Sequence, residues 1–506
     1  MPNRKNVIVF CTDQQRADSL GCLGNTLART PNLDALAGRG VLYSRHYAAN
    51  PVCMPSRCAF ITGRYPQANG VIDNGIHLPE REITLPEVFR RAGYRTAAFG
   101  KLHFQNFKPT ENDASFESYG RWNPGTLADR DKRVDLPPQP TCELDGWNGP
   151  YYGFEHVALA ACHGESASGH YGRWRQRVFP DLKLGPDHAQ GGPVFRQFAS
   201  WKSNQPLAAH HSTWVADRAI EFLEEIGEQP FFIFVSFPDP HHPFTPPAPY
   251  HSLFDDVTFP EPHAVPGENE TKPKPYRDAM TGNPFPTDGG ARYHPDLAGA
   301  AYRQIVAHTH GMVSLIDDSV GRVLAKLSEL GLADSTIVAF TADHGDFLGD
   351  HGFLNKGQLP SRSLLNIPLI ITDPGGATGV VDAPCSNVDV MPTLLALCGI
   401  PAPEGVQGVI LPRPGEAPRR PYAFEAGWSK ASPEYHHFSL YTQDWHIAVF
   451  PYLRDGELYD LRVDPWEHRN LYHDPAYREI KRDLLEELLY AAGQAEPPRP
   501  PVLTDW

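Results

Sequence analysis

The sequence has 506 residues, of which 45 are basic and 60 acidic, so its formal net charge at pH 7 is −15 with histidines counted as neutral. Hydrophobic residues make up 41% of the chain, enough for a sizeable core, which excludes wholesale disorder. The acidic balance and the absence of a run rich in Lys and Arg argue against nucleic acid as the main partner. At roughly 150 residues per domain the length allows about three domains, although large α/β enzymes often fold as one large unit with a smaller one.

No segment of the sequence is long and apolar enough to cross a membrane. The most apolar run, Phe231–Phe237, is far shorter than the ~20 residues that a helix needs to span hydrocarbon. The N-terminal apolar stretch is only Val7–Cys11 and Asp13 follows closely, which argues against a cleaved signal peptide. The eight cysteines follow neither a disulfide scaffold nor the CxxC spacing of zinc sites. We therefore expect a cytoplasmic protein without a membrane partner.

Short apolar runs, each followed at once by polar residues able to bind ligands, are the main structural signal. The five runs are Val7–Cys11 before Thr12-Asp13-Gln14, Thr96–Phe99 before Gly100-Lys101-Leu102-His103, Phe231–Phe237 before Pro238-Asp239-Pro240-His241-His242, Ile337–Phe340 before Thr341-Ala342-Asp343-His344, and Ile367–Ile371 before Thr372-Asp373. Continuous apolar runs of this length indicate strands buried on both faces of a mostly parallel sheet.

Helical patterns lie between these strands. Trp214–Ile226 is amphipathic, and Met312–Leu327 carries an apolar stripe at three- and four-residue spacing. Strands that alternate with helices predict a doubly wound α/β fold, whose ligands bind outside the carboxyl ends of the parallel strands. That rule brings six polar side chains to one edge of the sheet: Asp13, Lys101, His103, His241, Asp343 and His344.

The pattern changes after about residue 400. Trp445–Phe450 and Gly456–Tyr459 are strand-like, and Pro475–Ala492 is an amphipathic helix with proline in its first turn. We therefore divide the chain into a catalytic domain, 1–400, and a smaller C-terminal α+β subdomain, 401–506, whose Pro-rich tail is extended.

A cysteine stands at the start of a predicted helix. Pro55 suits the first turn of that helix and Gly63 suits its end. Cys53 then lies at the N-terminus, where unpaired backbone N–H groups favour anions. Arg57, four residues on, shares its side of the helix and offers a planar fork to an oxyanion. A lone cysteine is more often a packing residue, and we give Cys58 that interpretation.

The same segment resembles a family signature. Cys53-Met54-Pro55-Ser56-Arg57 fits the C-x-P-S-R motif of the type I sulfatases of the alkaline phosphatase superfamily. The similarity runs nearly end to end and also covers Asp13, Thr30–Asp34, Thr62–Pro66, Gly93-Tyr94, Gly100–His103, Pro240–Pro243, Asp343–Gly345 and Glu457–Leu461. The resemblance implies an alkaline-phosphatase-like fold, which agrees with the sheet predicted above. It also implies that a maturation enzyme oxidises the cysteine to formylglycine, whose hydrated aldehyde is the nucleophile.

The resemblance implies one divalent metal ion as well. Such an ion needs hard oxygen ligands and tolerates some nitrogen, and Asp13, Asp343, His344 and an oxygen on modified Cys53 stand at the family's metal positions. Many sulfatases have a second aspartate where this chain has Gln14, and an asparagine where it has His344. The pattern therefore looks more like that of choline sulfatases and phosphonate monoester hydrolases. Gln14 stays a candidate ligand through its amide. Calcium is the family default and imidazole shifts the preference toward manganese, so both metals stay open.

Positive charge must gather locally, because a protein with a net charge of −15 repels an anionic ester at long range. By resemblance, Arg57 and Lys101 hold the nucleophile and the sulfuryl oxygens. His241 and Lys356 would bind sulfate and protonate the leaving oxygen. His103 would act as the base when the covalent intermediate breaks down.

A substrate-binding residue follows from the same resemblance. Asn74, 21 residues after Cys53, matches an asparagine that contacts substrate in the choline-sulfatase and phosphonate-hydrolase branch. In the implied chemistry, one hydroxyl of the aldehyde hydrate attacks sulfur and displaces the alcohol, and deprotonation of the other expels sulfate and restores the aldehyde. The sequence thus predicts a sulfuric ester hydrolase that converts an aryl or alkyl sulfate, a small anionic ester, to an alcohol and inorganic sulfate.

Two alternatives stay open. One is a phosphonate monoester hydrolase or phosphodiesterase using the same site: the C-x-P-S-R motif favours sulfate, whereas the metal pattern favours phosphonate. The other, from a different class, is a non-catalytic anion-binding relative that keeps Cys53 unmodified.

Several other polar side chains receive structural interpretations. Asp239 and Asp373 are expected to cap turns beside proline, and His242 is a weaker catalytic candidate than His241. Four histidines on or before predicted helices are interpreted as surface or packing residues: His210, His211, His308 and His310. The region from Phe104 to Ser212 shows little periodicity, so we expect a long loop that forms the pocket for the alcohol. The oligomeric state is left open, with the Pro-rich tail as a candidate arm in a homo-oligomer.

Overall fold

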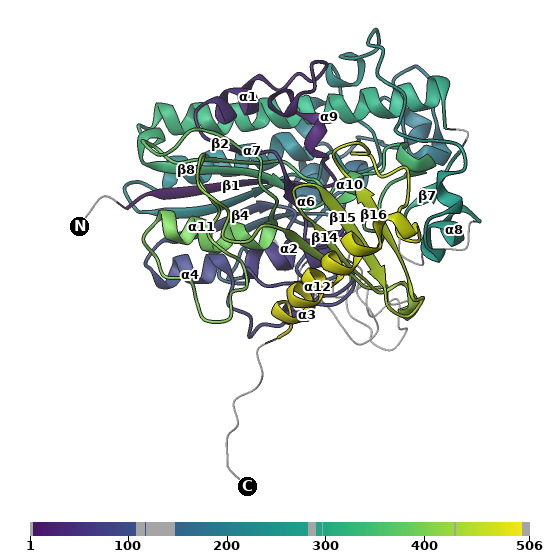
Figure 1. Cartoon of the computed structure of the whole chain (residues 1–506). Helices are drawn as coiled ribbons and strands as arrows, with labels where there is room; N and C mark the ends of the chain where they lie inside the picture. The colour runs from purple at the N-terminus through teal and green to yellow at the C-terminus, as the bar shows by residue number, and fades with distance from the viewer. Residues whose placement is uncertain are drawn as a thin grey trace, which may run out of the picture.

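The computed structural model describes residues 4–107, 117, 147–281, 290–295, 297–429 and 432–497. Its centre is an eight-stranded sheet with the strand order β11-β2-β10-β8-β1-β6-β4-β5 and helices on both faces (Figure 1). The strands are β1 (Asn6–Thr12), β2 (Val41–Tyr43), β4 (Arg95–Gly100), β5 (His156–Ala161), β6 (Phe231–Ser236), β8 (Thr336–Ala342), β10 (Leu369–Thr372) and β11 (Gly379–Val381). The predicted doubly wound, mostly parallel α/β fold is confirmed.

Each face of the central sheet carries its own set of helices. All of β1 is buried, and its alternate residues face opposite ways: Ile8 and Phe10 join one apolar cluster, Val7 and Val9 the other. The first cluster is covered by α1 (Pro31–Gly38), α7 (His211–Glu225) and α9 (Gly299–Glu329), and the second by α2 (Cys53–Thr62), α4 (Leu85–Arg91) and α11 (Val390–Leu397) (Figure 1). Burial on both faces explains the unbroken apolar runs.

One predicted strand runs the other way. β10 pairs antiparallel with both β8 and β2, whereas β1, β4, β5, β6 and β8 are parallel to one another. The end of β10 therefore lies at the opposite edge of the sheet from the ends of its parallel neighbours. Asp373, just after it, forms an ion pair there with Lys5, which precedes β1 (2.5 Å between Nζ and Oδ1).

The region from Phe104 to Ser212 is not one long loop. It contains β5, which pairs with β4 at the edge of the central sheet, and α6 (Gly169–Val178). The sequence pattern does not show these two elements clearly. β5 has only six residues, and α6 buries only two of its residues, so its apolar periodicity is weak. Residues 108–116 and 118–146 of this region lie outside the described residues.

A smaller α+β unit follows the central sheet in the sequence. Its four-stranded antiparallel sheet has the order β13-β14-β15-β16, formed by Ala423–Gly427, His437–Tyr441, Trp445–Phe450 and Asp455–Asp460. α12 (Arg478–Gln494) packs on this sheet and shares an apolar cluster with it (Figure 1, yellow). The C-terminal α+β subdomain is confirmed, and its boundary at residue 400 stays a prediction. Most of the predicted tail lies outside the described residues.

The remaining elements are short. They are β3 (His46–Tyr47), β7 (Arg292–Tyr293), β9 (Phe353–Leu354), β12 (Cys385–Ser386), α3 (Pro66–Asn69), α8 (Lys274–Met280) and α10 (Arg362–Leu365). None of the helices in the described ranges combines the length and the apolar character needed to cross a bilayer.

Candidate active site

Parallel strands β1, β4 and β8 end at the same edge of the sheet, and a charged residue follows each: Asp13, Lys101 and Asp343. Backbone hydrogen bonds continue from strand to strand at these ends. Asp343 N donates to Thr12 O (3.1 Å) and Lys101 N donates to Ser236 O (3.0 Å). The three charged residues are therefore fixed relative to one another by the sheet itself, as the sequence predicted.

Glycine is required immediately before Lys101. Gly100 has φ +103°, a left-handed conformation that residues with a Cβ rarely adopt. A Cβ at this position would lie 1.8 Å from Ser236 O, well inside van der Waals contact. The strand can therefore turn Lys101 toward the site only because residue 100 has no side chain.

The predicted cysteine stands at the start of α2, and Gly63 ends that helix in the left-handed conformation (φ +63°), as expected. Residue 53 is only 2% exposed. Asn74 accepts a hydrogen bond from Met54 N at its Oδ1 (2.9 Å), which fixes the first turn of α2 beside the loop that carries Asn74. The cysteine side chain is thus held in one place by the helix and its neighbours.

Four side chains form what we call the donor cluster: Asp13, Cys53, Asp343 and His344, whose ligand atoms all lie within 4.8 Å of one another. His344 Nε2 lies 3.1 Å from Cys53 Sγ, 3.7 Å from Asp13 Oδ1 and 3.6 Å from Asp343 Oδ1. Two ligands at right angles on an ion with bonds of about 2.4 Å lie about 3.4 Å apart. The spacing and the chemistry of the donor cluster therefore fit a divalent metal ion.

The imidazole of the donor cluster is already oriented as a ligand. His344 Nδ1 lies 2.8 Å from Gly345 O, and because a carbonyl only accepts, Nδ1 carries the proton and donates. In the neutral ring, the lone pair is then on Nε2, which faces the cluster. A second hydrogen bond that fixes the tautomer in this way is typical of metal-binding histidines.

Arg57 joins the two carboxylates of the donor cluster. Its guanidinium donates to Asp343 Oδ2 (2.7 Å) and to Asp13 Oδ2 (3.2 Å). It also donates to Lys101 O (2.8 Å) and to Ser236 Oγ (2.9 Å). Burial opposes ionisation of the Asp13 carboxyl, but Lys101 and Arg57 outweigh it and hold the pKa of Asp13 well below its ordinary value. Both cations thus keep Asp13 in the charged form that binds metal.

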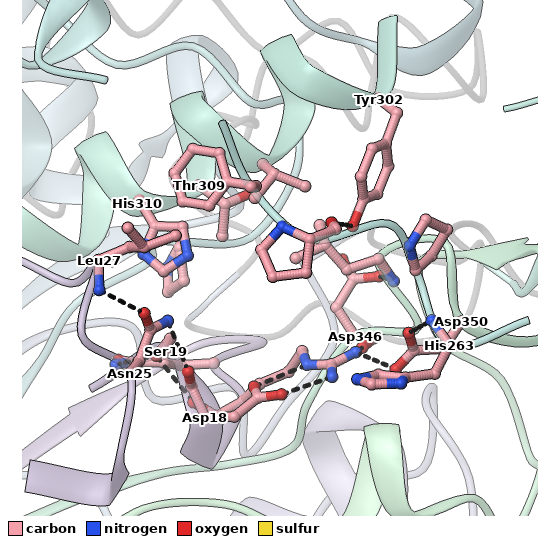
Figure 2. Close-up of a pocket in the computed structure, with 18 of the residues that line it drawn as sticks. Asp18, Ser19, Asn25, Leu27, His263, Tyr302, Thr309, His310, Asp346 and Asp350 are labelled. Carbon is pink, nitrogen blue, oxygen red and sulfur yellow. Dashed lines mark hydrogen bonds and ion pairs between the residues drawn. The ribbon is translucent and has the colours of Figure 1, made fainter. Parts of the chain in front are cut away.

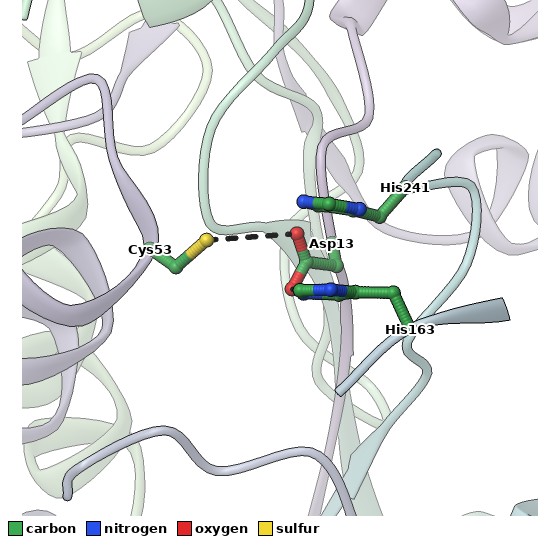
Figure 3. A group of neighbouring side chains, drawn as sticks. All are labelled: Asp13, Cys53, His163 and His241. Atoms are coloured by element: carbon green, nitrogen blue, oxygen red, sulfur yellow. Dashed lines mark hydrogen bonds and ion pairs between the residues drawn. The ribbon is translucent and has the colours of Figure 1, made fainter. Parts of the chain in front are cut away.

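A second group of side chains faces the same cysteine (Figure 3). The rings of His163 and His241 stack in parallel, with centroids 3.4 Å apart and planes 7° from parallel. Lys101 Nζ lies 2.5 Å from His163 Nε2, and Lys356 Nζ lies 2.5 Å from His241 Nε2. Each ammonium is thus paired with one ring of the stack. His163 had not been predicted, although it follows β5 as Lys101 follows β4.

Both stacked rings are neutral acceptors. His241 Nδ1 lies 2.5 Å from His242 O and therefore donates its proton to that carbonyl, leaving the Nε2 lone pair for Lys356. Burial and the neighbouring ammonium groups hold the pKa values of His163 and His241 well below the ordinary value. In both lysine–histidine pairs the imidazole therefore accepts the hydrogen bond.

The surroundings of Cys53 stabilise negative charge. Its Sγ lies 3.7 Å from Lys101 Nζ. Burial and the Asp13 carboxylate oppose ionisation of the thiol, but Lys101, Lys356 and the protonated form of His344 outweigh them, so the pKa of Cys53 lies below its ordinary value. An atom at this position that gains negative charge during a reaction is stabilised in the same way.

Gln14 lies between the donor cluster and Lys356. Its backbone N donates to Asp343 Oδ1 (3.0 Å), while its side-chain Oε1 accepts from Lys356 Nζ (2.8 Å). The amide Nε2 donates to Asp346 Oδ2 (2.5 Å) and lies 3.2 Å from His242 Nδ1. The side chain predicted as a candidate metal ligand therefore holds Lys356 in this structure, and Asp346 orients it.

His103 takes a position of its own. Its φ is +58°, its ring stacks on Phe107 with centroids 3.8 Å apart, and its Nδ1 is buried without a hydrogen-bond partner among the described residues. Lys101 Nζ lies over the other ring of that pair, 5.5 Å from the centroid of Phe107. The structure brings His103 to the same wall of the site as Lys101.

A cavity of about 270 Å³ is lined in part by Gln14 and Asp346, and Figure 2 shows Asp346 among the side chains around it. Its walls carry four carboxylates, from Asp18, Glu261, Asp346 and Asp350, against the guanidinium of Arg16. Arg16 donates to both Asp18 and Asp350. An acidic cavity of this kind repels an anionic ester, so the cation-rich side of Gln14 is the side suited to sulfate.

The histidines interpreted as surface or packing residues are all buried. His210, His211, His308 and His310 are at most 6% exposed, so the surface interpretation is wrong. The sequence pattern failed because the helices that carry them are covered by other segments of the chain.

Comparisons with known proteins agree with this geometry. The sulfatase family model matches residues 5–400, and a model described as N-sulphoglucosamine sulphohydrolase, C-terminal, matches residues 349–494. The arylsulfatase of Clostridium perfringens is 27% identical over 96% of this chain and 94% of its own, and the multifunctional alkaline phosphatase superfamily protein PehA of Trinickia caryophylli is 29% identical over 96% and 95%. The phosphonate monoester hydrolase of Agrobacterium radiobacter superposes with a TM-score of 0.77 at 26% identity, covering 97% of this chain and 96% of that one. The chain therefore belongs to the sulfatase family of the alkaline phosphatase superfamily and is a sulfuric ester hydrolase.

Proposed function

We propose that this sulfatase hydrolyses monoesters of sulfate with aryl or alkyl alcohols, using residue 53 as formylglycine and one divalent ion, Ca²⁺ or Mn²⁺, at the donor cluster. The observation that carries the proposal is the position of Cys53 Sγ. It is buried 3.1 Å from His344 Nε2 and 3.7 Å from Lys101 Nζ. A nucleophile at residue 53 would thus lie beside both a Lewis acid and an ammonium group.

The charge balance of the site favours a monoanionic ester, as a sulfate monoester is. Three cationic side chains, Arg57, Lys101 and Lys356, face two carboxylates, Asp13 and Asp343. A divalent ion would raise this local excess further. In a buried site the attraction for a monoanion is screened far less than in water, which offsets the repulsion by the net charge of −15.

Two groups complete the site. The metal ion, held by Asp13, Asp343, His344 and residue 53, would polarise the oxygens bound to it. Formylglycine would supply a hydrated aldehyde with one hydroxyl to attack sulfur and a second whose deprotonation expels sulfate.

The side chains of the chain itself then bind and move protons. Lys101, paired with His163, lies beside residue 53 and binds the sulfuryl oxygens. Lys356 holds a proton at Nζ, 2.5 Å from His241 Nε2, and this pair protonates the leaving alcohol oxygen. We retain His103 as the base of the second half-reaction, because its imidazole is buried beside Phe107, on which Lys101 also lies. Asn74 stays a proposed substrate contact at the start of α2.

Phosphonate monoester hydrolysis is the second candidate. The histidine of the donor cluster and Gln14 beside it resemble the phosphonate-hydrolase pattern, and the superposition on such an enzyme spans nearly the whole chain. The same cations suit a phosphonate anion equally well. Only the relative rates can separate the two activities.

The first experiment is mass spectrometry of the peptide that contains residue 53, from protein made with and without a formylglycine-generating enzyme. We expect the aldehyde at residue 53 only in protein made with the formylglycine-generating enzyme. The rate of aryl sulfate hydrolysis should be proportional to the fraction of chains that carry the aldehyde. Cys58→Ala is the matched control, because Cys58 is buried one turn later in α2, outside the donor cluster. An intact thiol together with full activity would refute the proposal.

The second experiment compares an aryl sulfate, a phosphodiester and a phosphonate monoester at equal concentrations. We expect the highest kcat/KM for sulfate. Phosphonate or diester turnover far above sulfate turnover would overturn the assignment in favour of the second candidate. The cytoplasmic location, the maturation enzyme as partner and a homo-oligomer remain proposals that rest on the sequence.

A further inference from the structure

A second group of potential metal ligands lies directly behind the active site. His210 and His211 stand at the start of α7, and Asp239 follows β6. All three are at most 2% exposed. The backbone O of Asp239 accepts a hydrogen bond from Asp13 N (3.0 Å), so the group supports the strand end that carries a member of the donor cluster.

Hydrogen-bond accounting determines which atoms of this group carry lone pairs. Ser212 Oγ donates its single proton to Asp239 Oδ2 (2.7 Å) and lies 3.2 Å from His211 Nδ1. With that proton used, His211 Nδ1 must donate to Ser212 Oγ, which leaves a lone pair on His211 Nε2. His210 Nδ1 is unprotonated, because Ser212 N donates to it (3.3 Å), and an ion bound at this nitrogen would replace that long hydrogen bond.

With Asp239 ionised, three unprotonated ligand atoms converge. His211 Nε2 lies 3.5 Å from Asp239 Oδ1, and His210 Nδ1 lies 3.8 Å from Asp239 Oδ2. His211 Nε2 and Asp239 Oδ1 have no hydrogen-bond partner among the described residues, and no Lys or Arg within the described ranges pairs with Asp239. A buried carboxyl without a counter-charge is ionised only at a cost of several kcal/mol, and a cation bound here would offset that cost.

The spacing distinguishes a metal ion from a bridging water. A water that bridges two polar atoms through hydrogen bonds of about 2.8 Å holds them about 4.5 Å apart. A four-coordinate ion with bonds of about 2.1 Å holds its ligands about 3.4 Å apart. The separation of 3.5 Å between His211 Nε2 and Asp239 Oδ1 is too short for the water and matches the ion.

We propose that His210, His211 and Asp239 bind a divalent transition-metal ion, such as Zn²⁺ or Co²⁺, as a structural site behind the catalytic centre. Two imidazole nitrogens and one carboxylate select these metals over Ca²⁺, which prefers oxygen. Ser212 Oγ donates to Asp239 Oδ2 (2.7 Å) and so orients the carboxylate, as hydrogen bonds to ligand side chains do in known metal sites. The ion would be taken up during folding, because the ligands are buried.

Another histidine–carboxylate group in the same protein shows the opposite pattern. Glu268 Oε2 accepts from His351 Nδ1 (2.9 Å) and from His468 Nδ1 (2.8 Å). Here donors and acceptor match, so the group is complete without an ion. It therefore supplies a control with the same residue types.

The test uses full-length protein produced in cobalt-supplemented medium and dialysed to remove loosely bound metal. Metal analysis should find about two ions per chain in the wild type and about one in His211→Gln and in Asp239→Asn, with the control His468→Gln unchanged from the wild type. The wild type should also show the intense visible absorption of four-coordinate Co²⁺. The same cobalt content in all four proteins would overturn the proposal.

A measurement on the wild type alone tests the proposal even if the variants do not fold. Crystals of the cobalt protein, measured at the cobalt edge, should show an anomalous peak between His211 Nε2 and Asp239 Oδ1. No peak at that position, with one at the donor cluster, would reject the second site, and the proposed sulfatase activity would be unaffected.

Discussion

Removing the guanidinium of Arg57 tests the electrostatic argument for the active site most directly. Arg57 is 3% exposed, and among the described Lys and Arg side chains it is the one that forms ion pairs with both carboxylates of the donor cluster. Arg57→Met keeps much of the apolar stem but leaves Asp13 and Asp343 without this partner. Breaking a buried ion pair from one side costs about 3–5 kcal/mol.

The expected shift in melting temperature follows from the size of the chain. An unfolding entropy of about 2.1 cal/mol/K per residue gives about 1 kcal/mol/K for the whole protein, so the loss corresponds to a fall of about 3–5 °C. Differential scanning calorimetry at one scan rate, with EDTA present, measures it. Adding Mn²⁺ should reduce the deficit, because the ion supplies positive charge to the same two carboxylates.

Arg462→Met is the matched control. Its guanidinium pairs with Asp460, but the side chain is 55% exposed, and exposed pairs contribute little to stability. We expect a shift below about 1 °C. If Arg57→Met melted within 1 °C of the wild type in EDTA, or the control fell equally far, the reasoning would be wrong.

Three further changes have defined outcomes. Cys53→Ser, which cannot be oxidised by a cysteine-specific maturation enzyme, should release at most about one equivalent of alcohol per site and then stop, as rapid-quench assays would show; steady turnover would contradict the two-hydroxyl chemistry. Gly100→Ala should prevent correct folding, because its Cβ would lie 1.8 Å from Ser236 O, and normal yield and activity would refute this. The third change is Glu467→Gln. Burial opposes ionisation of the Glu467 carboxyl, but His446 outweighs it and lowers the pKa of Glu467 from 4.5 to about 2. Its folded pKa is depressed, so about 3 kcal/mol of stability is present above pH 4.5 and is lost as the pH falls through about 2. Melting curves between pH 6 and 3 should therefore decline more steeply for the wild type than for Glu467→Gln.

The sequence alone determined where the chemistry lies. The apolar runs of β1, β4, β6 and β8 are continuous because both faces of the sheet are covered, and residues after parallel strands meet at one edge. The carboxylates of Asp13 and Asp343 could thus be assigned to one site before any coordinates were known, and the family resemblance added the cysteine at the start of α2.

Tertiary structure decided what a linear pattern cannot encode. The sequence of an apolar run does not determine whether the strand is parallel or antiparallel to its neighbours. Only the pairing with β8 shows that β10 is antiparallel. His163 had the same signal as Lys101, a polar residue after a short apolar run, but β5 is recognisable as a strand only by its pairing with β4.

The contacts of individual side chains also required the fold. Gln14 contacts Lys356, which lies more than 200 positions away in the sequence. Asp239 follows β6 but faces two histidines at the start of α7. Neither contact can be predicted from the residues next to Gln14 or Asp239. The spacing of residues in the sequence determines which of them lie on the same helix or strand. The packing of helices and strands against one another determines which hydrogen-bond donors and acceptors meet.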